Sequence, residues 1–395
     1  MKDKEIERLI KLEEHRQKNV INLIASENYV SQDILKALGS VFTNKYAEGY
    51  SGKRYYGGNE IVDRVENLAQ ERALNLFELS DSKWGVNVQP YSGSPANLAV
   101  YLALVPIGEK IMSLSLAMGG HLTHGHKVSA TGKIWNFVHY SLDPKTELLD
   151  YDAILQLAKK EKPKLIVAGF TAYSRVIDFK KFRKICDEVG ALFMVDMSHF
   201  AGLVAGKTYP APFLYADIVT TTAHKTLRGP RAAMIFSRKN MSHDSRFALH
   251  NLIDRAVFPG LQGGPHVNQI AATAVCLKEA ATPAFRKYAE QVVKNARAFV
   301  KELQNLGWRI ISGGTDSHLF LVDTWAKGIS GASAQELLEK QGIIVNKNAI
   351  PFDQRPPMDP SGIRIGTPAI TTQGMKEKDM KEIAARIDKI LKGSQ

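Results

Sequence analysis

Two ionisable side chains follow short apolar runs that have the composition of buried β-strands. Lys225 comes after the run IVTTT, with Arg228 and Arg231 close behind it, and Asp196 ends the run ALFMVD. Partial burial beside other cations lowers the pKa of a lysine and favours its neutral, nucleophilic amine. A buried carboxylate needs a cation or several hydrogen-bond donors, because leaving it unpaired costs several kcal/mol. The two runs predict a reactive amine and a paired acid, with His199 close enough to share their pocket.

A third stretch, YSGSPAN at residues 91–97, has the composition of an anion-binding turn. Ser92, Gly93 and Ser94 offer hydroxyl groups and unhindered backbone N–H groups, and Pro95 suits the first turn of a helix. A helix N-terminus of this kind can bind a phosphate through its free N–H groups and its dipole. Taken alone, the stretch is better explained as an ordinary capped helix.

Together these three features match the needs of pyridoxal phosphate. Its phosphate needs an anion cradle, its ring nitrogen needs a carboxylate that keeps it protonated, and its aldehyde needs an amine. Each feature alone has a commoner explanation, since an isolated lysine is nearly always solvated and an isolated aspartate often caps a loop. Their combination at successive strand ends predicts a pyridoxal phosphate site with the cofactor covalently bound to Lys225.

The elements that must position these residues alternate between strands and helices. Runs such as KIMSLS, KLIVAGF and ALFMVD are apolar at every position, as expected for strands that are covered on both sides. Helical patterns separate them, which predicts an α/β fold with a largely parallel sheet and helices on both faces. Ligands of such sheets bind outside the carboxyl ends of the strands, where the polar residues lie.

Helical patterns flank this alternating region. Residues 3–18 form an amphipathic arm, and a second helix begins after its predicted N-cap, Ser31. Residues 59–79 predict a helix with Ile61, Val65, Leu68, Ala69 and Leu76 on its apolar face. Near residue 270 the pattern changes to long helices followed by shorter strands. A chain of 395 residues usually needs more than one core, so we expect a helical arm (1–20), a large cofactor-binding domain (21–275) and a small domain (276–395).

Composition narrows the classes of partner. The formal net charge is +12, which favours anionic partners, but the basic residues are dispersed and lack aromatic interleaving. Anionic small molecules are therefore favoured, and a basic nucleic-acid-binding protein is the alternative from another class. No apolar run approaches the ~20 residues that span a bilayer, and the charged N-terminus has no signal-peptide core. Cys186 and Cys276 are too few for a disulfide framework, which favours the cytoplasm.

Two other stretches resemble sites without meeting their requirements. GLVAGKT, residues 202–208, is one residue short of a P-loop between its glycines. HLTHGH contains His121, His124 and His126, but it lacks an accompanying carboxylate or thiolate cluster and does not have zinc-site spacing. We predict no metal here, and expect one imidazole to stack on a ring while the others hydrogen-bond locally.

Eight motifs in order resemble the serine hydroxymethyltransferase family over essentially the whole chain. They are NLIASEN, NKYAEGYSGKRYYGG, QPYSGSPAN, GGHLTHG, VDMSHFAGLVA, TTAHKTLRGPR, FPGLQGGPH and SGIRIGTPA. The resemblance implies a fold-type I, aspartate-aminotransferase-like large domain with a mostly parallel seven-stranded sheet, a smaller α+β C-terminal domain and an N-terminal helical arm. It implies a pyridoxal-phosphate-dependent glycine hydroxymethyltransferase that reversibly transfers the hydroxymethyl group of L-serine to the cosubstrate tetrahydrofolate, giving glycine and 5,10-methylenetetrahydrofolate.

The same resemblance implies roles for the cofactor-binding residues. Lys225 matches the lysine that binds the aldehyde, and Asp196 matches the partner of the ring nitrogen. His121 matches the imidazole stacked on the ring, and His199 the one beside the phenolic oxygen. The other implied positions are Ser92, Gly93 and Ser94 at the phosphate, Thr171, and Gly263 and Gly264, which reach a phosphate across a subunit interface. The implied assembly is a homodimer, or a dimer of dimers, with shared active sites.

Substrate positions follow from the resemblance as well. Arg364 in GIRIG matches the residue that binds the substrate carboxylate, which suits its bidentate guanidinium, and Glu48 in YAEGY is the leading acid–base candidate. His224, Tyr46 and Tyr56 are the other implied catalytic residues. The remaining amino-acid and folate positions are Ser26, Tyr55, Leu116, Gly120, Leu122 and Asn348.

Several residues depart from the common family pattern. Met118 stands where a histidine is usual, Ala223 replaces a threonine, and Pro356 and Pro357 occupy a region near the folate. Alanines at 232 and 233 replace paired glycines. These departures leave the cofactor motifs intact and alter residues that line the binding site of the second substrate. The alternative is therefore a folate-independent aldolase, or a hydroxymethyltransferase for a related amino acid such as α-methylserine.

Overall fold

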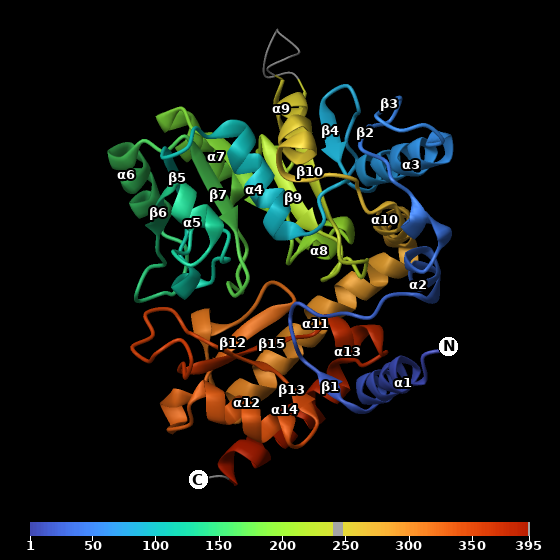
Figure 1. Cartoon of the computed structure of the whole chain (residues 1–395). Helices are drawn as coiled ribbons and strands as arrows, with labels where there is room; N and C mark the ends of the chain where they lie inside the picture. Colours follow the sequence, from blue (N-terminus) through green and yellow to red (C-terminus); the bar gives the residue numbers. More distant parts are fainter. Residues whose placement is uncertain (240–247, 394–395) are drawn as a thin grey trace.

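The computed structural model describes residues 1–239 and 248–393, and Figure 1 shows how its layers are arranged. A seven-stranded sheet with the order β4-β10-β9-β8-β7-β5-β6 forms the centre of the larger part. Only β10 in this sheet is antiparallel to its neighbours, so β4 runs in the direction of β9. The predicted mostly parallel sheet is confirmed. Its strands are β4 (Trp84–Asn87), β5 (Lys110–Leu114), β6 (Asn136–Tyr140), β7 (Leu165–Gly169), β8 (Leu192–Asp196), β9 (Ile218–Thr222) and β10 (Ala233–Arg238).

Both faces of this sheet are buried, which explains why its strands are apolar at every position. Along β7, Leu165 and Val167 pack into the core on one face, while Ile166 and Ala168 pack into the core on the other. The first face is covered by α4 (Gly93–Leu104) and α9 (Leu249–Arg255). The second is covered by α3 (Glu60–Leu76), α6 (Tyr151–Glu161), α7 (Phe179–Val189), α8 (Ala201–Ala205) and α10 (Val267–Ala280).

A second, smaller sheet has its own core, drawn in the lower part of Figure 1. It is antiparallel, with the order β11-β12-β15-β14. Its strands are β11 (Arg309–Ile310), β12 (Leu319–Asp323), β14 (Asn346–Asn348) and β15 (Gly362–Gly366). The helices of this part are α11 (Pro283–Asn305), α12 (Gly331–Glu339), α13 (Pro368–Thr372) and α14 (Glu377–Lys392). Short elements complete the fold: β1 (Ile21–Asn22) paired with β13 (Ile343–Ile344), β2 (Gly49–Tyr50) paired with β3 (Lys53–Arg54), and α5 (Ala130–Ile134).

Helix α11 connects the two cores. Its first half contributes Phe285 and Val292 to the large core, and its second half contributes Phe299 and Leu303 to the small one. The expected boundary after residue 275 falls inside α10, and residues 21–22 pair with β13 beside the small core. We keep the division into residues 1–20, 21–275 and 276–395 as a proposal.

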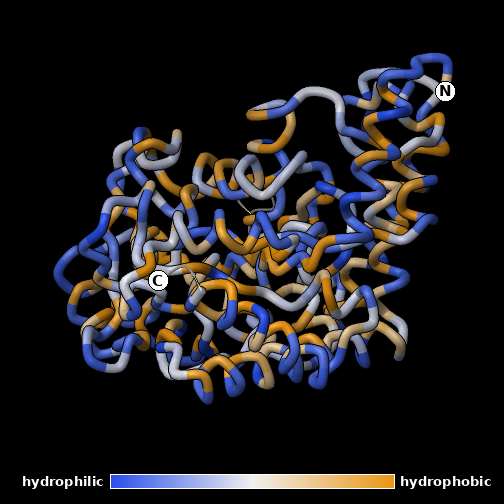
Figure 2. The backbone as a smooth tube through the Cα atoms, turned by 90° about the horizontal axis from the view of Figure 1, so that it is seen from below, coloured by the Kyte–Doolittle hydropathy of each residue, from blue (hydrophilic) through white to orange (hydrophobic). Residues whose placement is uncertain are grey.

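The helices near the N-terminus are where the sequence patterns place them, with one difference. Helix α1 (Lys4–Asn19) has no buried residue and lies beside the body in Figure 2, and α2 (Gln32–Leu38) is capped by Ser31 as predicted. In α3 the predicted apolar face is wrong in part. Ile61 and Leu68 are exposed, whereas Glu66 is buried, because its carboxylate is 2.7 Å from a guanidinium nitrogen of the buried Arg54. Among the residues that the structure describes, every helix is too short or too polar to span a bilayer.

Candidate active site

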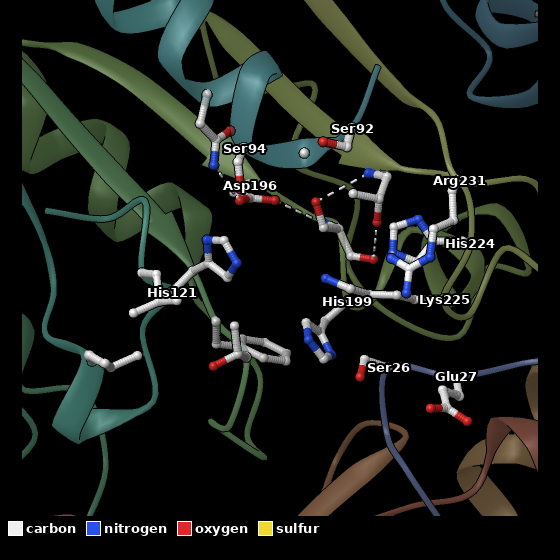
Figure 3. Close-up of a pocket in the computed structure, with 18 of the residues that line it drawn as sticks. Ser26, Glu27, Ser92, Ser94, His121, Asp196, His199, His224, Lys225 and Arg231 are labelled. Carbon is white, nitrogen blue, oxygen red and sulfur yellow. Dashed lines mark hydrogen bonds between the residues drawn. The ribbon is translucent and has the colours of Figure 1, made fainter. Parts of the chain in front are cut away.

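A cavity of about 470 Å³ lies where the carboxyl ends of β4, β8 and β9 meet. Figure 3 shows side chains from segments far apart in the sequence, such as Ser26, Asp196 and Lys225, around it. The structure thus brings together most of the predicted site residues, although they come from distant parts of the sequence. Those that line the cavity are Ser26, Ser92, Gly93, Ser94, Leu116, His121, Leu122, Thr171, Asp196, His199, His224, Lys225 and Arg364.

Lys225 lies in the turn after β9, half-buried. Burial lowers its pKa to about 8; nearby Asp196 opposes this shift, and the charges of Arg364 and Arg231 reinforce it. The predicted influence of Arg228 is wrong. Its backbone has a φ of 61°, and its guanidinium lies over the ring of Tyr288 at 4.2 Å. The amine therefore owes its lowered pKa first to burial and then to Arg364, from the smaller sheet.

Asp196 is buried at the end of β8 with three hydrogen-bond donors. Its Oδ1 accepts the N–H of Ser198 at 3.0 Å, and its Oδ2 accepts Nδ2 of Asn97 at 2.9 Å and Nε2 of His124 at 3.2 Å. Burial alone would raise the pKa of this carboxyl, but its neighbours, above all the hydrogen bond from His124, outweigh burial and lower it. The aspartate is therefore held as an anion in a fixed orientation.

The histidines of the HLTHGH stretch have different partners. Nδ1 of His124 accepts the backbone N–H of His121 at 3.2 Å, so its proton is on the Nε2 that faces Asp196. The expectation that His124 bonds only locally is wrong, because its second partner is 72 residues away. His121 lines the cavity, and burial lowers its pKa to about 4. The part of the chain that the structure describes contains no cluster of three metal-ligating side chains.

The predicted anion cradle lies at the start of α4. Ser92 is the N-cap residue, but its hydroxyl makes no capping hydrogen bond to the helix. A Cβ at Gly93 would come within 2.7 Å of Cγ2 of Thr222, so no larger side chain fits there without displacing its neighbour. A serine hydroxyl, exposed helix N–H groups and a backbone without a side chain therefore face the cavity.

Arg364 reaches the cavity from β15 of the smaller sheet. Its Nε donates to Oδ1 of Asn346 at 3.0 Å, and its Nη1 donates to the carbonyl of Thr171 at 2.6 Å. Burial lowers its pKa to about 10, so the guanidinium remains a cation at neutral pH. These two hydrogen bonds fix the plane of a cation that can bind a carboxylate.

A second group of predicted residues lies outside this cavity. Glu48 and Tyr55 line a separate, shallow cavity with residues 258–263, which include Gly263. The hydroxyl of Tyr46 is 3.3 Å from Oε1 of Glu48, and the rings of Tyr46 and Tyr56 are in edge contact. Within one chain, these residues do not line the cavity of Lys225.

The last three predicted residues lie near the cavity without lining it. The carbonyl of Gly120 accepts the hydroxyl of Thr171 at 2.7 Å, and Asn348 ends β14 beside β15. Gly264 accepts the hydroxyl of Tyr91, the residue before Ser92, at 2.8 Å through its carbonyl.

Sequence reasoning missed residues that hold the predicted ones in place. Asn97 is part of the YSGSPAN stretch and His124 of the HLTHGH stretch, yet their bonds to Asp196 depend on long-range packing. His318 has its Nε2 3.2 Å from Nδ1 of His199. Apart from its apolar neighbours, the sequence around it gives no indication of this contact. The only local indication for Asn97 is its position, because its side-chain amide lies one helical turn after a loop of the phosphate-binding type.

Comparison with known proteins agrees with this geometry. The sequence model of the family described as serine hydroxymethyltransferase matches residues 1–387. A protein named serine hydroxymethyltransferase from Koribacter versatilis (strain Ellin345) is 54% identical over 390 residues, covering 99% of this chain and 89% of that protein. The match spans both sheets and every residue of the cavity. The chain therefore belongs to the serine hydroxymethyltransferase family.

Proposed function

We propose that the chain carries out the reaction of its family in the Lys225 cavity, with pyridoxal 5′-phosphate bound covalently to Lys225. The reaction is the reversible transfer of the hydroxymethyl group of L-serine to tetrahydrofolate, which gives glycine and 5,10-methylenetetrahydrofolate. One observation carries the proposal: a lysine of lowered pKa, an aspartate with three donors and an open helix N-terminus share one cavity.

The residues present fit each part of this cofactor. Ser92, Gly93 and Ser94 would bind the phosphate at the start of α4, where Thr222 leaves space only for glycine at 93. Lys225 would bind the aldehyde, and Asp196 would pair with the ring nitrogen. When bound, pyridoxal phosphate supplies a cationic ring that stabilises negative charge at the α-carbon of the amino acid.

The side chains around Asp196 maintain this arrangement. Because the pKa of Asp196 is lowered, it stays anionic and would keep a proton on the ring nitrogen of the bound cofactor. Asn97 and His124 stop the carboxylate from rotating. His121, neutral at pH 7 because burial lowers its pKa, would stack on the ring, and Thr171 and His199 would complete the wall.

The amino acid would be held by groups from both parts of the chain. Arg364 would bind the carboxylate of serine, and Ser26 would contribute its hydroxyl from the segment after β1. Burial, followed by the charges of Lys225 and Arg231, lowers the pKa of His224 to about 3. His224 would therefore act as a neutral hydrogen-bonding side chain next to Lys225.

A second copy of the chain would complete the site. Glu48, Tyr55 and Gly263 line a cavity separate from that of Lys225, and Tyr55 is 74% exposed. Large exposed aromatic side chains mark surfaces that become buried on association. We therefore propose a homodimer, or a dimer of dimers, in which Glu48 of one chain acts as the acid or base on serine bound beside Lys225 of the other, with Tyr46 and Tyr56 holding Glu48.

Tetrahydrofolate would bind at the outer edge of the cavity. Leu116 and Leu122 line it and are 38% and 45% exposed, so they offer apolar surface to a flat ring. Gly120 and Asn348 lie close by. We also propose a cytoplasmic location, since both cysteines are buried and free.

Chemical trapping of the cofactor tests this function. Borohydride reduction of the purified protein, followed by peptide mapping, should place a pyridoxyl group on Lys225. Serine turnover should then require added tetrahydrofolate. A label on another lysine, or cleavage of threonine or phenylserine without folate that is faster than serine turnover with it, would contradict the proposal.

A further inference from the structure

A second buried imidazole, His318, lies directly behind His199. His199 follows strand β8 of the large sheet, whereas His318 immediately precedes β12 of the small one. Nδ1 of His199 is 3.2 Å from Nε2 of His318, and the two rings stack with an interplanar angle of 25°. His199 lines the cavity and His318 does not. The contact therefore joins a cavity residue of one part of the chain to a hidden residue of the other.

Both imidazoles are neutral at neutral pH. Burial, reinforced by the charges of Arg364 and Lys225, lowers the pKa of His318 to about 3. Burial also lowers the pKa of His199 well below its ordinary value, with further contributions from Lys225 and Arg364. A neutral imidazole has one N–H donor and one acceptor nitrogen, so one ring must donate to the other across the contact.

The second nitrogen of His318 decides the direction of this hydrogen bond. Its Nδ1 is buried and has no hydrogen-bond partner within residues 1–239 and 248–393. A proton on Nδ1 would leave a buried donor unpaired, and buried unpaired N–H groups are rarer than under-satisfied acceptors. The proton of His318 therefore lies on Nε2, and Nδ1 of His199 accepts it. His199 must then carry its own proton on Nε2.

We propose that His318 is a positioning residue, which holds His199 as the tautomer with its N–H at Nε2 and directs that donor to the cavity beside Lys225. His318 is itself fixed, because its carbonyl accepts the N–H of Thr367 at 3.0 Å. The carbonyl of His199 accepts the hydroxyl of Thr226 at 2.8 Å. Figure 3 shows the ring of His199 between Lys225 and Ser26. A fixed donor there suits an anionic oxygen of the cofactor, a step that rests on the proposed function.

The experiment first determines the tautomer of His199 and then removes the N–H donor of His318 by substitution. Holoprotein with ring-¹⁵N-labelled histidine is studied by two-bond ¹H–¹⁵N correlation NMR, and His199 is assigned with a His199→Asn variant. His318→Leu removes the donor and keeps an apolar side chain, whereas His318→Gln keeps an N–H near the position of Nε2. His250→Gln, on the distant helix α9, is the matched control for loss of a histidine.

We expect His199 of the unchanged protein to have a protonated Nε2 and an unprotonated Nδ1. His318→Leu should lose this single tautomer and slow serine turnover about tenfold, the scale of one lost hydrogen bond, with little change in KM. His318→Gln should restore both the tautomer and turnover to within about threefold. The control should change neither.

Two results would overturn the proposal: a proton on Nδ1 of His199 in the unchanged protein, or a His318→Leu variant with the same His199 signals and turnover as His318→Gln. If circular dichroism shows that the leucine variant does not fold, the tautomer of His199 in the unchanged protein and in the glutamine variant still tests the proposal. The tautomer can also be read without cofactor or substrate, so failure of the proposed function is a separate, distinguishable outcome.

Discussion

The Lys225 cavity and the surface around Glu48 differ in how far one chain completes them. In the cavity, Asp196 is 7% exposed, and its two oxygens accept three hydrogen bonds. On the Glu48 surface, Tyr46, Tyr55 and Tyr56 are 57%, 74% and 49% exposed. One chain therefore organises the groups that fit the cofactor, whereas Glu48, the acid–base group that we propose, lies on a surface that we propose a second copy covers. The predictions that follow test each side of this division, from the largest expected effect to the smallest.

Removing the amine should have the largest effect. Lys225→Ala should lower serine turnover by at least about a thousandfold, because no other side chain of the cavity can bind the aldehyde covalently. Borohydride should then leave no pyridoxyl group at position 225. The Glu48 surface is untouched by this change, so the oligomeric state measured by light scattering should not alter. Lys340→Ala, at the exposed C-cap of α12, is the control. Near-normal turnover of Lys225→Ala would place the chemistry elsewhere.

Replacing the acid of the cavity should have the next largest effect. Asp196→Asn keeps the shape of the side chain, so the protein should fold, but a neutral amide cannot keep the ring nitrogen protonated. We expect turnover to fall about a hundredfold, the scale of losing one strong electrostatic contact. Turnover and thermal unfolding should be measured together. A variant with nearly normal turnover and an unchanged Tm would refute the role given to this carboxylate.

Replacing Arg364, the cation that we propose binds the carboxylate of serine, should have a smaller effect, mainly on the KM for serine. Arg364→Lys keeps the charge but loses the planar fork that Asn346 and Thr171 hold in place. We expect KM for serine to rise about tenfold, with a smaller change in kcat, because one of two parallel hydrogen bonds is lost. Steady-state kinetics over a range of serine concentrations measure both. A large fall in kcat with an unchanged KM would show that Arg364 does not hold the carboxylate.

The smallest effect should be the change with pH in the rate at which the cofactor adds to Lys225. Only the neutral amine of Lys225 can attack an aldehyde, and its pKa is lowered to about 8. The rate of addition of pyridoxal phosphate to cofactor-free protein should therefore rise with pH up to about 8 and level off above it. An ordinary exposed lysine, with a pKa near 10.4, would keep accelerating beyond that pH. Stopped-flow absorbance between about pH 6.5 and 9.5 separates the two outcomes.

Much of the fold could be predicted because strands buried on both faces are apolar at every position. The same rule predicted the site, since the carboxyl ends of parallel strands meet at one edge and bring Asp196 and Lys225 together. Local spacing could not predict pairings across long stretches of sequence. His124 reaches Asp196 over 72 residues, and His318 reaches His199 over 119.

Two of the errors, those at α3 and at Arg228, have the same origin. In α3 the pattern of apolar residues predicted the wrong edge of the buried face, because it could not show that Arg54 and Gln89 pair with Glu66 and allow it to be buried. Arg228 was expected beside Lys225 from sequence proximity alone, yet the rings of Tyr288 and Phe285 on α11 attract its guanidinium. In both cases the deciding partner lies outside the stretch whose pattern was interpreted.

The most direct test of the division between the two regions is complementation between two inactive variants. Lys225→Ala and Glu48→Gln are purified separately, mixed, and allowed to exchange subunits. In a mixed dimer, one active site combines an intact Lys225 with an intact Glu48, while the other carries both defects. We predict that serine turnover reappears in the mixture, although neither variant is active alone. Turnover that stays at the level of the separate variants, with mixed dimers shown to have formed by mass spectrometry, would contradict the account.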